Sequence, residues 1–237
     1  MSGTAPRTRP AATRDALVEA AFALFLEQGF ERTTVDEIAA RAGIGRRSFF
    51  RYFPSKEDVV FPDHERSLDD LRAALDEPGA EPGEEDPVAR ACAATLVVAR
   101  MYAAQPDRSL LRYRLTRQVP ALRSRELTVV GRYERALAEY LRRSFGGRPD
   151  GRLRADVVAA SAVAAHNNAL RSWLRAGATG DAVAEVDRAL DLVRTAWGTG
   201  QGAGQAPEQD YVVLVARRGA PLPRVVRDLE AVLGERE

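Results

Sequence analysis

Residues 33–57 read TTVDEIAARAGIGRRSFFRYFPSKE and form the most informative segment of the chain. Thr34, with Glu37 three positions later, has the pattern of a capping box, which predicts the start of a short helix. The Gly-Ile-Gly sequence at 43–45 interrupts that helix, and a further helix is expected over 46–52. Two short helices joined by a glycine-containing turn and packed on a preceding helix form a helix-turn-helix.

The sequence on either side of this stretch also has helical patterns. Thr13 is expected to cap a helix over 13–28, whose apolar residues recur at helical spacing. Ser55 is expected to cap a fourth helix that runs to about residue 75, with a bend at Pro62. After an acidic, proline-containing linker over 76–87, further helices are expected near 88–105, 107–118, 121–145, 156–176 and 181–197.

The C-terminal part changes character. Residues 199–208 are rich in Gly and Gln and are interpreted as a flexible linker. Tyr211–Ala216 is β-branched without a helical period, which predicts a strand followed by a short helix, a strand–helix extension over 209–234. The predicted fold class is therefore all-α, with a three-helix helix-turn-helix domain over 13–60, a helical bundle over 61–198 and this small extension.

Composition excludes several classes of protein. The 237 residues are 45% hydrophobic and 29% charged, as in proteins that bury a core. No apolar run approaches the ~20 residues of a membrane helix, so no membrane association is expected. The single cysteine, Cys92, cannot form an internal disulfide and is interpreted as a small buried side chain in a cytoplasmic protein. His64 and His166 lack ligand spacing, and no nucleophile–base pattern occurs, so no metal, cofactor or enzymatic activity is expected.

The net charge of +1 does not indicate a nucleic-acid partner, but one segment is locally basic. Between Arg41 and Lys56 there are five basic residues and no acid. Arg46 and Arg47 fall in the first turn of the second short helix, where an arginine can bond guanine in bidentate fashion. Lys56 is expected to neutralise a phosphate, and the helix start at Thr34 can hold another. The alternative is a solvated basic face on a three-helix core.

Residues 33–39 (TTVDEIA) and 43–57 (GIGRRSFFRYFPSKE) together resemble the TetR family of bacterial transcriptional regulators, and the match covers about residues 13–60. The resemblance implies an all-α homodimer with N-terminal DNA-binding domains. It also implies that the bundle over 61–198 is a ligand-binding and dimerisation domain.

The resemblance assigns the DNA contacts by motif position. Gly45 stands where Ser or Thr is common in the family, so the second short helix lacks a side-chain cap. Phe50 stands where Tyr is common and loses a hydroxyl that would bond phosphate. The DNA-binding residues expected on this basis are Thr34, Gly45, Arg46, Arg47, Ser48, Phe50, Arg51, Tyr52 and Lys56.

The bundle offers candidates for a ligand site. The side chains proposed to line it are Met101, Tyr102, Tyr113, Tyr133 and Asn167, the alternative being plain core with an amide that satisfies backbone groups. The five arginines from Arg112 to Arg125 could meet an anionic ligand, but we favour a solvated face. The stretch 49–75 is similar to family members that bind acyl-CoA-like ligands, which makes such a molecule the first candidate effector.

The repeat of Val183, Val186, Leu190, Val193 and Trp197 is an a/d seam, which with the helix over 156–176 predicts a four-helix dimer interface. The predicted function is a one-component regulator, in our interpretation a repressor, that binds palindromic operator DNA as a homodimer. A hydrophobic small-molecule ligand would release it. The alternatives are a dimeric helical adaptor with a vestigial DNA-binding half and a protein partner, and an enzyme built on a helical bundle.

Overall fold

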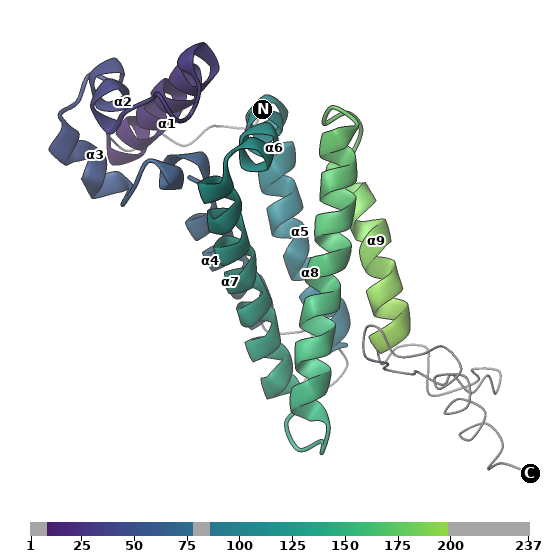
Figure 1. Cartoon of the computed structure of the whole chain (residues 1–237). Coiled ribbons are helices and arrows are strands. Elements are labelled where there is room, and N and C mark those ends of the chain that lie inside the picture. Colours follow the sequence, from purple (N-terminus) through teal and green to yellow (C-terminus); the bar gives the residue numbers. More distant parts are fainter. Residues whose placement is uncertain (1–8, 78–85, 199–237) are drawn as a thin grey trace, which may run out of the picture. The chain divides into compact units, whose positions relative to one another are not determined.

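The computed structural model describes residues 9–77 and 86–198, and all regular structure in these two segments is helical (Figure 1). This confirms the all-α prediction for that part of the chain, whereas the predicted linker over 199–208 and strand–helix extension over 209–234 lie outside the described residues. The elements are α1 (Arg9–Gln28), α2 (Val35–Arg41), α3 (Arg46–Tyr52), the 3-10 helix η1 (Glu57–Val60), α4 (His64–Asp76), α5 (Pro87–Ala103), α6 (Pro106–Gln118), α7 (Pro120–Ser144), α8 (Gly151–Arg175) and α9 (Ala182–Trp197).

Helices α1, α2 and α3 form the predicted helix-turn-helix around a shared apolar cluster. The capping box at the start of α2 is confirmed, because the Glu37 amide donates to Thr34 Oγ1 at 3.2 Å and the Thr34 amide donates to Glu37 Oε2 at 2.7 Å. Gly43 in the turn has φ +70°, a left-handed conformation that a residue with a Cβ rarely adopts. One boundary prediction is wrong: α1 begins at Arg9, so Thr13 lies inside the helix and does not cap it.

The predicted fourth helix is wrong, because the chain forms two separate elements there, η1 and α4. Pro62 has no N–H to donate to the carbonyl of Asp58, and its ring would collide with that carbonyl in a continuous helix. The Phe61 amide instead closes a tight turn on Asp58 at 3.1 Å. Ser55 does not cap η1; its hydroxyl donates to the Asp58 carboxylate at 2.8 Å.

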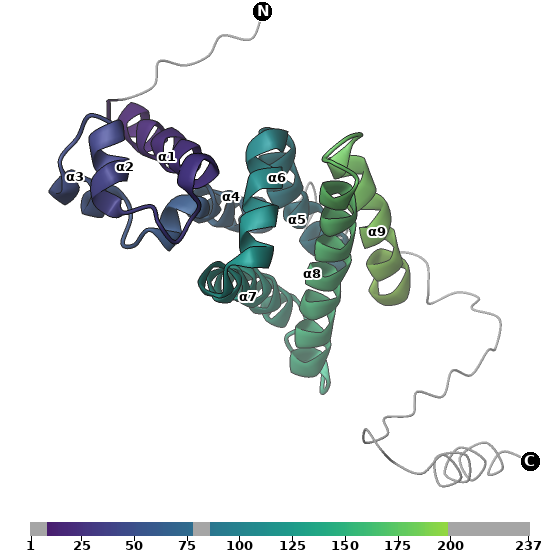
Figure 2. The ribbon, with the colours of Figure 1, turned by 45° about the horizontal axis from the view of Figure 1, so that its top comes forward.

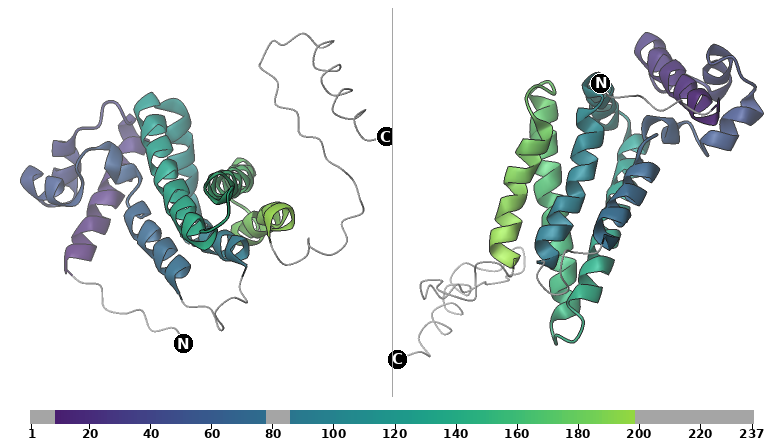
Figure 3. Two further views of the ribbon diagram at one scale, coloured as in Figure 1. Left: turned by 90° about the horizontal axis from the view of Figure 1, so that it is seen from below. Right: turned by 180° about the vertical axis from the view of Figure 1, so that it is seen from behind.

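The remaining helices pack into a bundle with one extended apolar core. Helix α8 packs against α7 and α9, and α5 packs against α9 and α4, as the views in Figures 2 and 3 also show. Helix α8 begins at Gly151, several residues before the predicted start. The turn from α7 requires this glycine, because a Cβ at position 151 would collide with the carbonyl oxygen of Phe145. Within residues 9–77 and 86–198, no helix has the length and apolar character needed to cross a bilayer.

The a/d seam of α9 packs inside the chain rather than between two subunits. Val186, Leu190 and Val193 are buried in the same core as α5 and α8. The prediction that these residues form a dimer interface is therefore wrong, because the helices of one chain already cover them. The exposed large apolar side chains of this region are instead Leu153 and Val157 on α8 and Leu192 on α9.

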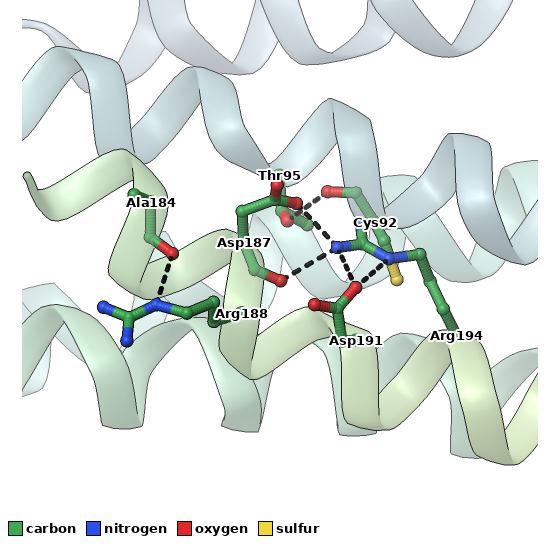
Figure 4. Close-up of polar contacts among 7 residues, drawn as sticks. All are labelled: Cys92, Thr95, Ala184, Asp187, Arg188, Asp191 and Arg194. Atoms are coloured by element: carbon green, nitrogen blue, oxygen red, sulfur yellow. Dashed lines mark hydrogen bonds and ion pairs between the residues drawn. The ribbon is translucent and has the colours of Figure 1, made fainter.

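The contact between α5 and α9 also buries Cys92, beside a polar cluster on α9 (Figure 4). Arg194 Nη2 lies 2.6 Å from an oxygen of Asp187 and 2.8 Å from one of Asp191. Cys92 itself is fully buried, and burial raises the pKa of its thiol to about 11. Since only the thiolate is a good nucleophile, the interpretation of Cys92 as a small buried side chain is confirmed.

Candidate DNA-binding surface and ligand cavity

Helix α3 presents one face to solvent and anchors itself with the other. Phe49 is fully buried in the helix-turn-helix core, whereas Phe50 is 44% exposed. Arg46 and Arg47 are also exposed, in the first turn of the helix. Gly45 caps α3 without any side-chain hydrogen bond, as expected. The helix thus offers two arginines and an aromatic ring on a face that its own core leaves open.

The two arginines of this face differ in their partners. Arg46 Nη1 lies 2.7 Å from Asp36 Oδ2, and both side chains are more than half exposed. Such an exposed pair is weak and can be exchanged for a base or phosphate. In the part of the chain that the structure describes, the Arg47 side chain makes no ion pair or hydrogen bond, so it is available without breaking a contact. Arg41 is held by Glu27 through bonds of 3.0 and 2.6 Å.

The other residues expected to contact DNA differ in how exposed their side chains are. Ser48 and Tyr52 are half-buried, and Arg51 is exposed at the end of α3, with Nη2 3.5 Å from Tyr52 Oη. The Thr34 hydroxyl is already engaged in the capping box. The structure therefore brings most of the expected residues to the α3 surface or its edge, with Thr34 at the start of α2.

Lys56 has an internal role that the sequence did not indicate. Its ammonium donates to the carbonyl oxygens of Phe30 at 2.8 Å and Thr33 at 2.9 Å. It also lies over the Phe30 ring, 4.2 Å from the centroid. Two of its three donors thus tie down the connection between α1 and α2. Lys56 therefore has a structural role in addition to the phosphate contact expected for it, which stays a prediction.

Replacing Lys56 with Ala should therefore lower the free energy of unfolding by about 1–3 kcal/mol, because two carbonyls lose a charged donor. The urea midpoint of the full chain measures this. Arg51→Ala removes a neighbouring exposed charge that makes no such backbone bonds, and it should leave the midpoint unchanged. Equal stability of Lys56→Ala and the parent would show that the internal bonds contribute nothing.

A cavity opens between α4, α5, α6, α7 and α8, with about 60 Å³ of space for the centre of a water-sized sphere. Four of the five expected ligand residues line it: Tyr102, Tyr113, Tyr133 and Asn167. Met101 does not; it faces a separate surface depression beside α4. Most other lining side chains are apolar, and no hydrogen bond within the described residues engages the Asn167 amide.

The cavity also contains buried polar groups that sequence reasoning missed. His64 accompanies Tyr133: the tyrosine hydroxyl donates to the His64 carbonyl at 3.0 Å and lies 3.1 Å from His64 Nδ1. Burial lowers the pKa of His64 well below its usual value and that of His166 to about 4, so both rings are neutral near pH 7. Within the described part of the chain, no three His, Cys, Asp or Glu side chains gather as metal ligands.

Arg112 corrects the interpretation of the five arginines as a solvated face. It is only 4% exposed, and its guanidinium lies over the Tyr102 ring, 5.0 Å from the centroid. Arg125 forms an ion pair with Asp58 of η1. The remaining three, Arg114, Arg117 and Arg123, are exposed as expected.

Both halves of the described chain match known family models. Residues 17–61 match the model for bacterial regulatory proteins of the tetR family, and residues 85–198 match the MftR C-terminal domain. Together these matches cover more than half of the chain.

Individual proteins agree with these models. The chain is 28% identical to the transcriptional regulator MftR of Mycobacterium tuberculosis over 70% of its own length and 82% of that protein. It is 36% identical to the HTH-type transcriptional regulator TcmR of Streptomyces glaucescens over 62% of this chain and 59% of that one. A solved SmeT–triclosan complex has the same fold, with a TM-score of 0.55 and 20% identity over 85% of this chain and all of that one. The helix-turn-helix with its exposed α3 and the two family matches lead to one conclusion: the chain belongs to the TetR family of bacterial transcriptional regulators.

Proposed function

We propose that this regulator is a repressor that binds a palindromic operator as a homodimer and is released by a small, mostly hydrophobic ligand in the α4–α8 cavity. The observation that supports it best is the open face of α3, where Arg47 has no partner among the described residues and Arg46 pairs with the exposed Asp36. Such a protein acts where its operator lies, in the cytoplasm.

Helix α6 supports the link between ligand and DNA. Arg112 and Thr116 on one side of it line the cavity. Leu115 of the same helix belongs to the apolar cluster of the helix-turn-helix, together with Val119 and Leu122 at the junction with α7. A ligand that moves α6 would therefore also shift the surface on which α1–α3 rest.

The mechanism we propose is linkage between two conformations. Successive major grooves on one face of DNA are ~34 Å apart, so a dimer needs its two α3 helices at about that spacing. A ligand that binds better to a conformation with a different spacing weakens operator binding, and the operator weakens ligand binding by the same factor. Coupling of about 1–3 kcal/mol is sufficient for a 5- to 150-fold change.

The dimer in this proposal uses surface that the chain leaves uncovered. Leu153 on α8 and Leu192 on α9 are exposed large apolar residues on two helices that lie side by side. Small residues on α8 allow close approach of a second copy. The interface would thus use the outer faces of the same two helices whose inner faces build the core.

The effector we propose is hydrophobic because apolar side chains such as Val98, Leu137 and Leu170 dominate the lining. A long-chain acyl-CoA remains the first compound of that kind to test. Ligand sites for drug-sized molecules usually hold about 300–1,000 Å³, so the α4–α8 cavity must widen to accept one.

Arg47→Ala tests the DNA-binding assignment. It should weaken binding to an operator selected from genomic fragments by about 1–3 kcal/mol, or 5- to 150-fold, and relax sequence preference at one position. Arg46→Ala should weaken binding less, because the parent must first give up its pair with Asp36. Fluorescence anisotropy over a range of salt concentrations measures both.

Arg114→Ala, an exposed arginine on α6, is the matched control and should bind the operator like the parent. If Arg47→Ala also binds like the parent, α3 does not read the DNA. If the parent itself shows no salt-dependent binding to any fragment, the adaptor alternative replaces the regulator.

A further inference from the structure

The α4–α8 cavity contains a buried positive charge without a counter-ion. Arg112 is 4% exposed, and its Nε and Nη1 atoms have no hydrogen-bond partner among the described residues. The Tyr102 ring below the guanidinium offsets only part of the loss of water. A buried charge left unpaired destabilises a protein, so a group that pairs with it would be bound strongly.

No residue that the structure describes forms an ion pair with Arg112. Glu126 is the acidic residue of the lining, but it forms no ion pair with Arg112 within the described residues. Burial raises the pKa of the Glu126 carboxyl, although the charges of Arg171, Arg123 and Arg112 act in the opposite direction. Arg171 lines the same cavity and adds a second positive charge. The field in the cavity thus favours an anion.

Two buried histidines supply the neutral polar contacts. The Tyr133 hydroxyl donates to the His64 carbonyl, so its oxygen accepts from Nδ1–H, which leaves His64 Nε2 as an acceptor. That atom and both ring nitrogens of His166 have no partner in the described part of the chain. A neutral His166 has one donor and one acceptor to offer. A ligand hydroxyl can satisfy such groups, because it both donates and accepts.

We propose that the effector is an organic carboxylate whose anionic end pairs with Arg112, whose hydroxyl meets His64 and His166, and whose apolar body lies against Val129 and Leu170. This inference rests on the proposed function, since it names the ligand class of the same cavity. A carboxylate fits because its two oxygens match two N–H donors of a guanidinium. Because both histidines are neutral near pH 7, Arg112 is the group that attracts the anionic end of the ligand.

The limited space adds a mechanical consequence. About 60 Å³ is less than the 150 Å³ of an engineered cavity that binds benzene. Even a one-ring acid must therefore push the lining outward. Arg112 itself is on α6, so the movement begins on the helix that also contacts the helix-turn-helix core.

Matched pairs of probes that differ in charge test this proposal: salicylate against salicylamide, and decanoate against decanamide. Isothermal titration with the full chain should give a dissociation constant about 10- to 100-fold lower for at least one carboxylate than for its amide. Arg112→Gln should abolish that preference, and Arg112→Lys, which keeps the charge, should retain part of it. Circular dichroism verifies that both variants fold.

Several results would overturn the proposal. One is that neither carboxylate binds better than its amide; another is that the preference survives in Arg112→Gln. A third is that decanoyl-CoA alone binds, and binds Arg112→Gln equally well, because its charges are on phosphates rather than at the chain's carbonyl. Operator binding is measured separately by anisotropy. If the protein binds no operator while the preference for the carboxylate persists, the proposed repressor function is wrong and the proposed anion site remains supported.

Discussion

Replacing Leu190 with Asp should prevent the chain from folding. Leu190 is 0% exposed, in the core that α9 shares with α5 and α8. The change removes a large apolar side chain and places a carboxylate where no donor can solvate it. The combined loss should exceed about 5 kcal/mol, comparable to the whole stability of a typical domain. The helical signal in circular dichroism and the soluble yield measure it.

Leu192→Asp is the matched control, two positions along the same helix. Leu192 is 74% exposed on the opposite side of α9, so the variant should fold with the melting temperature of the isolated chain unchanged. Under the proposed dimer, it should also sediment as a monomer. Normal melting of Leu190→Asp would contradict the internal packing of the seam, and an undisturbed Leu192→Asp dimer would place the interface elsewhere.

Acidification should destabilise the protein through its buried histidines. Burial lowers the pKa of His166 to about 4, whereas the unfolded chain titrates near 6.5. The unfolded state therefore binds more protons between these values. The stabilisation is fully present above pH 6.5 and is lost as the pH falls towards 4, amounting to about 3 kcal/mol for His166. His64 acts in the same direction.

The urea midpoints of the parent and of His166→Gln, each measured near pH 7 and near pH 4.5, test this expectation. The fall in stability on acidification should be smaller in the variant, because His64 and the carboxylates contribute equally to both proteins. An equal fall in the two proteins would mean that His166 is not held neutral in the folded state.

Local signals in the sequence were sufficient to predict most helices. The capping box at Thr34 and the prolines at 87, 106 and 120 fix helix starts, because a cap or a missing N–H acts within one turn. The two errors have opposite causes. Helix α1 includes Thr13 and begins before it, whereas the helix expected to bend at Pro62 is interrupted there. The periodicity of α9 showed that one face is buried, but not whether its partner is in the same chain.

The cavity was predictable only in part. Tyr102, Tyr113 and Tyr133 stood out as aromatic residues on the middle helices, and the structure places all three on its lining. Arg112 did not stand out, because it is one of several arginines in a row with no local feature that marks it as buried. His64 and His166 are about a hundred residues apart, and only the packing of α4 against the rest of the bundle brings them to one cavity.

The shared cluster at the α6–α7 junction limits how this protein can be recombined. A chimera that joins residues 9–60 to a foreign effector domain would remove Leu115, Val119 and Leu122, which complete the core of the DNA-binding head. The chimera would then expose apolar surface that the parent covers. Its DNA-binding domain would lose stability regardless of the operator sequence. Exchange of ligand specificity between relatives should therefore succeed when the donor segment keeps these three positions apolar and of similar volume. In evolution, the DNA-binding domain and the ligand-binding domain of this protein are therefore expected to change together, because they share one apolar cluster.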